Sequence, residues 1–191
     1  MKHHPSVRLN PYLFVFLLLG LFAIVIGCQE IKIPAGEIDL ENRPDQEAWN
    51  TTIYLSQDGR QQAIIKAAHR QRYNSRQQTI IDQGIFVEFY DENGLTSTLQ
   101  AERGIIDELS NNLWVYGGVV IDSPEHGSLK TDSLQWIEEK DLIETEAHVT
   151  LSTKKDLITG QGFEADPGLK NWTIRHNVQG QSIRDENDKK N

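Results

Sequence analysis

Residues 113–137 read LWVYGGVVIDSPEHGSLKTDSLQWI, two runs of alternating apolar and polar residues on either side of a turn, SPEHG, at 123–127. An alternation with a period of two is typical of a strand that buries one of its faces. Proline and glycine within the turn end both runs. The stretch therefore predicts a β-hairpin with one apolar face.

The hairpin pattern recurs along the chain with a period of about 30 residues. One set of apolar residues repeats at intervals of 30, 30 and 29: Phe89, Val119, Val149 and Val178. A second set follows the first three by 10, 10 and 9 residues: Leu99, Leu129 and Ile158. A unit of this length that cannot bury itself alone indicates a supersecondary element stacked several times. We predict an all-β protein, a twisted antiparallel jellyroll of roughly 30-residue hairpin repeats over residues 51–180. Residues 62–71 fit either a short helix or a strand, and the alternation that follows them favours a strand.

The apolar parity changes at the same place in the second strand of each repeat. It slips after Ala101, Thr131 and Gly160, and it resumes three residues later at Gly104, Leu134 and Phe163. A one-residue slip at a fixed place in a repeat is typical of a β-bulge.

Composition excludes several classes of function. The net charge of −9 offers no basic stripe for nucleic acid. The histidines beyond the N-terminal segment have no metal-ligand spacing, and 160–162 (GQG) has no phosphate-loop spacing. No motif for nucleophilic catalysis occurs. We therefore expect no enzyme, no metal and no cofactor.

The N-terminal segment predicts a tether to a membrane. Lys2 and Arg8 precede an apolar run at 12–27, which ends in the sequence VIGC with Cys28 as the only cysteine. A basic region, a short apolar run and a Gly-Cys boundary are typical of a lipoprotein signal, in which Cys28 would be lipidated. The alternative is an uncleaved membrane anchor. The predicted parts are a signal or anchor (1–27), a linker (28–50), the jellyroll (51–180) and a polar tail (181–191).

The order of these motifs resembles the LptC family of lipopolysaccharide-export proteins. The resemblance rests on a membrane segment followed by Leu99-x-Ala101-x-x-Gly104, Val115-Tyr116-Gly117-Gly118-Val119, Gly127-x-Leu129-x-Thr131-Asp132-x-Leu134-x-Trp136 and Ile158-x-Gly160-x-Gly162-Phe163. It implies an OstA-like jellyroll whose interior holds the acyl chains of lipid A. It also implies that lipopolysaccharide comes from an inner-membrane ABC transporter and passes to a homologous periplasmic bridge protein. The implied location is the periplasmic face of the inner membrane, rather than the outer membrane.

The expected lipid-binding residues are the apolar positions of inward parity. They are Val87, Phe89, Leu99, Ala101, Ile106, Val115, Val119, Ile121, Leu129, Leu134, Trp136, Ile143, Val149, Ile158, Phe163, Ile174 and Val178. Small residues of the same parity (Gly104, Gly117, Gly160 and Ala101) favour an unfilled interior. One rival hypothesis is a scaffolding lipoprotein that pairs through its strand edges and has a filled interior. An envelope hydrolase is a weaker rival, and it would require two converging carboxylates.

Overall fold

The computed structural model describes residues 43–182, which form one antiparallel β-sheet of ten strands. The strands are β1 (Gln46–Gln57), β2 (Arg60–Tyr73), β3 (Gln78–Asp91), β4 (Gly94–Ala101), β5 (Arg103–Asp107), β6 (Leu113–Ser123), β7 (Gly127–Ile137), β8 (Leu142–Ser152), β9 (Asp156–Ala165) and β10 (Trp172–Ser182). One short 3-10 turn, η2 (Glu138–Lys140), precedes β8, and the described residues contain no α-helix. The all-β prediction is confirmed, and so is the preference for a strand at 62–71, which lies within β2.

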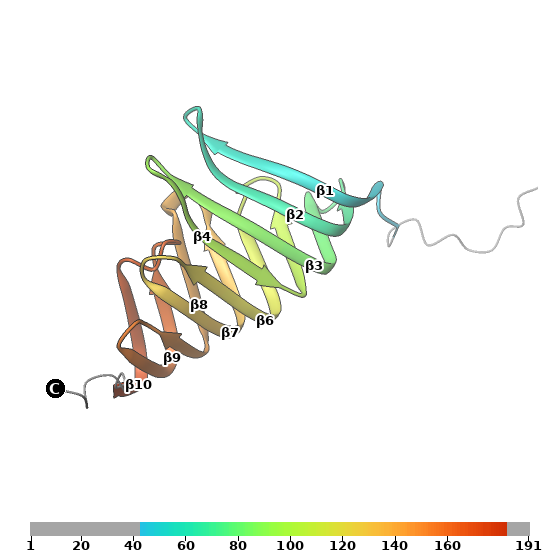
Figure 1. Ribbon diagram of the computed structural model, residues 1–191. Helices are drawn as coiled ribbons and strands as arrows, with labels where there is room; N and C mark the ends of the chain where they lie inside the picture. The colour runs from blue at the N-terminus through green and yellow to red at the C-terminus, as the bar shows by residue number, and fades with distance from the viewer. Residues whose placement is uncertain (1–42, 183–191) are drawn as a thin grey trace, which may run out of the picture. The chain divides into compact units, whose positions relative to one another are not determined.

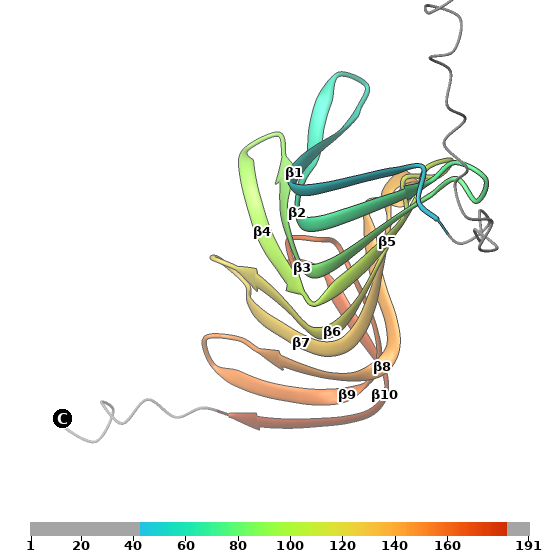
Figure 2. The same ribbon diagram turned by 90° about the vertical axis from the view of Figure 1, so that its right-hand side faces the viewer.

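The strands follow one another across the sheet in chain order, and the sheet is folded into a trough. The order is β1-β2-β3-β4-β6-β7-β8-β9-β10, and β5 continues the path of β4 between β3 and β6. Figure 1 shows this stacking, and Figure 2 shows that the strands bend partway along their length, so that the sheet has two walls. Wall I carries the turns at 57–60, 91–94, 123–127 and 152–156, and wall II carries those at 73–78, 107–113, 137–142 and 165–172.

The bend between the walls coincides with irregularities in the strand ladders. β4 ends at Ala101 and β5 begins at Arg103, so that Glu102 alone lies at the corner. The Gly84 N–H donates to the Glu102 carbonyl at 2.9 Å, and the Glu102 N–H donates to the Gly117 carbonyl at 3.0 Å. Other register shifts occur after Thr131 in β7 and between Tyr116 and Val119 in β6. Bulges let a strand turn sharply without losing its inward face, and the predicted phase slip is thus confirmed.

Cross-strand pairing explains one of the two repeating sets. A continuous inward row crosses the sheet from β1 to β9 through Ile53, Ile65, Val87, Leu99, Ile121, Leu129, Leu151 and Ile158. Leu99, Leu129 and Ile158 all belong to it, so the second repeating set corresponds to a real row. Burial of this apolar row on one face of the sheet is the main force that stabilises the fold.

The first repeating set, which a regular period of 30 would place in one stripe across the sheet, does not form a single row, because Phe89 lies in another row and Val178 is exposed. Val119 pairs with Thr131, which pairs with Val149, whereas Phe89 pairs with Ser97 and Ala63 in a row nearer to the turns of wall I. The period of two in a strand fixes the face of a side chain but not its row. The spacing of 30 residues therefore gave the correct face for Phe89 but not its row.

The ends of the sheet extend beyond the predicted boundaries. β1 begins at Gln46, inside the stretch 28–50 that composition assigns to a linker, and β10 runs to Ser182, inside the predicted tail. The signal or anchor segment, Cys28 and the rest of the tail lie outside the described residues. Within residues 43–182, no helix is long and apolar enough to cross a membrane.

Candidate functional site

The interior of the trough gathers most of the predicted lipid-binding residues. The buried ones are Val87, Phe89, Leu99, Ile106, Val115, Val119, Ile121, Leu129, Leu134, Trp136, Ile143, Val149 and Phe163. Ala101, Ile158 and Ile174 are partly buried and pack against this core. These residues come from both walls, because the bulges restore the inward parity after each bend.

Val178 does not belong to this packed interior. Its side chain is 57 % exposed. It lies on β10, whose pairing with β9 is irregular between His176 and Gln179, and Asn177 beside it has a φ of 53°.

Sequence reasoning missed several residues of the same core. They are Ala63, Ile65, Ala67, Ile81, Ile85, Leu113, Leu151, Ala165 and Leu169. The alternation in β2 and at the start of β6 was a sufficient signal for those two strands. Leu169 had no such signal, since it lies in the loop between β9 and β10.

The interior is filled by side chains, and the expectation of an unfilled interior is wrong for this state. Trp136 is 0 % exposed, and its ring packs edge-on against Phe89 with the centroids 5.2 Å apart. The glycines that suggested empty space are positions where neighbouring atoms already approach. A Cβ on Gly104 would lie 2.9 Å from Ile85 Cδ1, and one on Gly160 would lie 2.3 Å from Ile174 Cγ2. Small residues here permit close packing instead of leaving a cavity.

Gly117 has a different reason for being glycine. Its φ is +81°, and a Cβ there would lie 2.5 Å from Glu102 Oε2 at the corner of the sheet. A left-handed backbone beside a close neighbour favours glycine whether or not the interior is filled.

A cavity lies where the turns of the two walls approach each other. Its volume is about 560 Å³, and its lining comes from wall I (Tyr90, Leu95, Thr96, His126) and from wall II (Asp141, Pro167, Gly168, Lys170). The Trp136 indole N–H donates to Asp141 at 3.4 Å. Burial raises the pKa of Asp141, the hydrogen bond from Trp136 opposes this, and the charges of Asp166 and Asp91 raise it further. The cavity thus has the packed interior at one end and a polar, acidic opening at the other. We use the word seam for the place beside this cavity where the wall I turns at 91–94 and 123–127 meet the wall II loop at 165–172.

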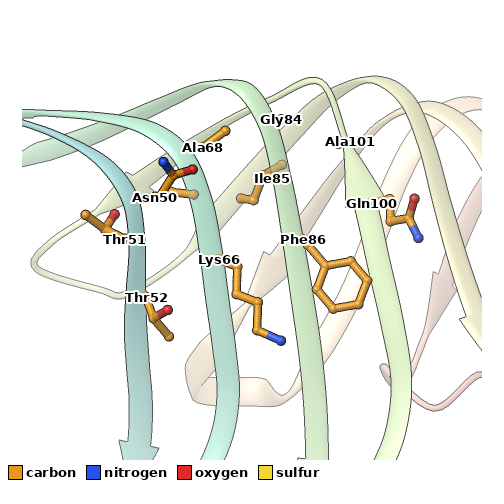
Figure 3. Close-up of a pocket in the computed structure, with 11 residues that line it drawn as sticks. Asn50, Thr51, Thr52, Lys66, Ala68, Gly84, Ile85, Phe86, Gln100 and Ala101 are labelled. Atoms are coloured by element: carbon orange, nitrogen blue, oxygen red, sulfur yellow. The ribbon is translucent and has the colours of Figure 1, made fainter.

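A second cavity, of about 520 Å³, lies at the bend of β1–β4. Figure 3 shows Thr52, Lys66, Phe86 and Gln100 there, which pair with one another in a row across these strands. The Lys66 ammonium lies 3.0 Å from Glu88 Oε1 and 5.3 Å from the centre of the Phe86 ring. Its charge is thus already compensated by its neighbours.

Polar chemistry on the described residues gives no sign of a catalytic or metal site. No group of three or more His, Cys, Asp or Glu side chains within 43–182 could hold a metal ion. His69 comes nearest, but Asp82 and Glu47 bond its two ring nitrogens. No pair of carboxylates converges on the packed interior, whose buried polar residues are chiefly serine and threonine, with His69 and Glu138 nearer its margins.

Comparison with known proteins identifies the family. No curated protein matches the chain. The family described as "Lipopolysaccharide-assembly, LptC-related" matches residues 12–183, which include the whole described sheet and the apolar N-terminal run. The chain therefore belongs to the LptC-related family of lipopolysaccharide-assembly proteins, which are transport components of the cell envelope and not enzymes.

Proposed function

We propose that this protein is a membrane-tethered periplasmic component of the lipopolysaccharide transport bridge, and that it carries the lipid A acyl chains on the inward face of its sheet. The observation that supports this most is the inward apolar row that crosses from Ile53 on β1 to Ile158 on β9. A row that runs from β1 to β9 offers a lipid equivalent contacts along its path.

Acyl chains suit such a surface for a simple physical reason. Burial of each methylene is favourable by about 0.8 kcal/mol, and it needs no specific direction or polar partner. A chain can therefore exchange one set of Leu, Val and Ile neighbours for the next at little cost. Directed movement would come from the ABC transporter, and this protein would hydrolyse nothing.

The two edges of the sheet suit transfer to and from similar proteins. Within the described residues, β1 pairs only with β2, and β10 pairs only with β9. A homologous sheet that pairs with β1 would extend the inward row beyond Ile53, and one that pairs with β10 would continue the sheet beside the end of the row. We propose the inner-membrane transporter and a homologous periplasmic bridge protein as the two partners.

The proposed tether is the N-terminal segment, held by a lipid on Cys28 at the inner membrane. The family match begins at residue 12, where the apolar run begins. Several acyl chains on one cysteine would give lasting attachment.

Photo-crosslinking in cells tests the proposal. A photoreactive amino acid at Val119 or Trp136, both buried in the interior, is expected to form a lipopolysaccharide adduct. Matched control positions are Gln100 and Val120, which pair with each other on the outward face. Adducts from the outward positions alone would refute lipid transport in the interior.

The filled interior supports one alternative, a scaffold that joins other β-proteins through its edges and carries no lipid. It predicts no adduct from any inward position while the edge contacts persist. Depletion of the protein also separates the two hypotheses. A transport component should leave lipopolysaccharide accumulated at the inner membrane, whereas a scaffold need not.

A further inference from the structure

The loop between β9 and β10, residues 166–171, belongs to wall II but is bonded to wall I. The Ser97 hydroxyl on β4 donates to the Pro167 carbonyl at 2.6 Å, although the two residues are 70 positions apart. His126, in the turn of wall I, places Nδ1 3.1 Å from the Gly168 carbonyl. A carbonyl only accepts, so this Nδ1 carries the proton. The loop thus spans the seam.

The burial of Ser97 depends on the position of this loop. Its side chain is 0 % exposed, and it pairs across the strands with Phe89. A buried hydroxyl is costly unless it is hydrogen-bonded. Its partner here is supplied only when the loop lies across the seam.

Leu169 fills the core from this loop. It is 1 % exposed and belongs to the same buried cluster as Phe89 and Trp136. Its φ of 59° is uncommon for a bulky residue, and such a conformation persists only where the surroundings enforce it. The loop therefore places the Leu169 side chain into the core from the side of the seam.

Hydrogen bonds within the loop stabilise its conformation without any contribution from wall I. The Asp166 carboxylate accepts the Lys170 and Asn171 backbone N–H groups at 3.1 and 2.7 Å. The Leu169 N–H donates to the Asp166 carbonyl at 3.0 Å. These bonds lie within the loop and involve no residue of wall I, so displacement of the loop would break its attachments to Ser97 and His126 and expose the buried Pro167 and Leu169.

The cavity at the seam lies beside this loop, with Pro167, Gly168 and Lys170 in its lining. A volume of about 560 Å³ is within the range of small-molecule sites. Leu169 is not part of that lining; it lies between the lining residues Gly168 and Lys170 in the chain, and its side chain belongs to the packed core.

We propose that the 166–171 loop is a displaceable closure of the seam, and that Leu169 occupies the place that an acyl chain takes when the roll is loaded. The inference rests on the proposed function and adds the access route to it. Displacement of the loop resolves the conflict between a filled interior and a lipid cargo, because a chain that replaces Leu169 restores the buried apolar contacts.

A reversible cross-link across the seam tests this. A Cβ on Gly168 would lie 3.4 Å from Thr96 Cβ, close to the separation found in disulfides, and its φ is not left-handed. Thr96→Cys/Gly168→Cys should lock the loop under oxidation. The control pair Asp122→Cys/Ser128→Cys joins two paired strands within wall I and leaves the seam free. Both pairs are made in the full chain with Cys28→Ala, in detergent, with a photoreactive residue at Val119.

Adducts with purified lipopolysaccharide are then compared before and after reduction. We expect oxidation of the seam pair to lower the Val119 adduct at least tenfold, reduction to restore it, and the control pair to show no change. Equal adducts in the locked and reduced seam pair would overturn the closure while leaving lipid binding intact. Absence of adducts from both pairs in both states would overturn the proposed function, and the closure with it.

A variant that loosens the loop gives an independent result. Ser97→Ala removes the hydroxyl that bonds Pro167, and it should raise the initial rate of adduct formation severalfold. The control Ser110→Ala removes a serine hydrogen bond of another kind, an exposed local bond to Asp107 in a turn of wall II away from the 166–171 loop. It should leave the rate unchanged. Equal rates for both variants would contradict the closure.

Discussion

Gly127 illustrates how closely neighbouring backbones approach at the residue scale. It begins β7 with a φ of +107°, and a Cβ there would lie 2.1 Å from the Ser152 carbonyl oxygen. That oxygen belongs to the neighbouring backbone, which cannot rotate away as a side chain can. Two separate costs therefore fall on any substitution, a strained φ and a steric clash.

We predict that Gly127→Ala lowers the free energy of unfolding by about 2–4 kcal/mol, as expected for strain combined with overpacking. Gly59→Ala should cost about 1–2 kcal/mol, since its φ is +78° but no atom lies within 4 Å of the added Cβ. Gly180→Ala, with open space and no left-handed φ, should have little effect. Urea unfolding measures all three. Similar losses for Gly127→Ala and Gly59→Ala would show that the close contact with Ser152 is absent.

The residues of the seam show a limit of sequence reasoning at this scale. The alternation in the strands predicted the inward side chains, because parity along a strand is a local property. Leu169 lies in a loop whose pattern, DPGLKN, indicates only a turn. Ser97 has its partner 70 residues away. Contacts of that range depend on how the walls fold together, which no local period encodes.

At the scale of elements, a charged clamp joins the first three strands. His69 on β2 lies 2.5 Å from Asp82 on β3 through Nδ1, and 2.8 Å from Glu47 on β1 through Nε2. Trp49 on β1 stacks against its ring, with the centroids 4.9 Å apart. Only a protonated imidazole can donate to both carboxylates. The hydrogen bond to Asp82, followed by the one to Glu47, raises the pKa of His69 above its ordinary value.

This clamp predicts a pH dependence of stability with a definite sign. Because the folded pKa lies above the ordinary value of about 6.5, the contribution of His69 is complete below that pH. It is lost as the pH rises through the folded pKa. We expect the melting temperature of the wild type, relative to His69→Gln, to fall as the pH rises from about 6 through this range. Circular dichroism at successive pH values measures it.

The control for this experiment is His176→Gln, on an exposed position of β10. Its melting temperature should follow the wild type across the pH range. A constant difference between the wild type and His69→Gln at all pH values would mean that the clamp contributes packing but no charge.

The rows of the sheet show how far periodicity reaches at the element scale. The period of 30 correctly placed Leu99, Leu129 and Ile158 in one row, since hairpins of similar length bring equivalent residues opposite one another. It misplaced Phe89, because the distance from the bend to the turn differs between β3 and β6. The bulges were predictable from the phase slip, whereas the folding of the sheet into two walls that meet at a seam was not.

At the scale of the whole described sheet, one continuous core argues for one cooperative unit. The inward row runs from Ile53 on β1 to Ile158 on β9 without a break, and β10 adds Ile174 to the same cluster. Each pair of neighbouring strands along this path is joined by apolar side chains of the row. The described sheet therefore offers no weak boundary at which unfolding could stop. The two edges should therefore unfold together, although they share no direct contact in the sheet order.

Two single-tryptophan variants test this cooperativity. One retains Trp49 on β1 and the other retains Trp172 on β10, and Phe replaces the other three tryptophans in each. We predict the same urea midpoint and the same slope from both fluorescence signals. Leu129→Ala, in the centre of the row, should lower the free energy of unfolding by about 2–5 kcal/mol and move both transitions equally. Separate midpoints, or a shift at one edge only, would show that the sheet unfolds in parts. A sheet that responds as one unit is also what a lipid path from one edge to the other requires, because a locally unfolded strand would interrupt the row.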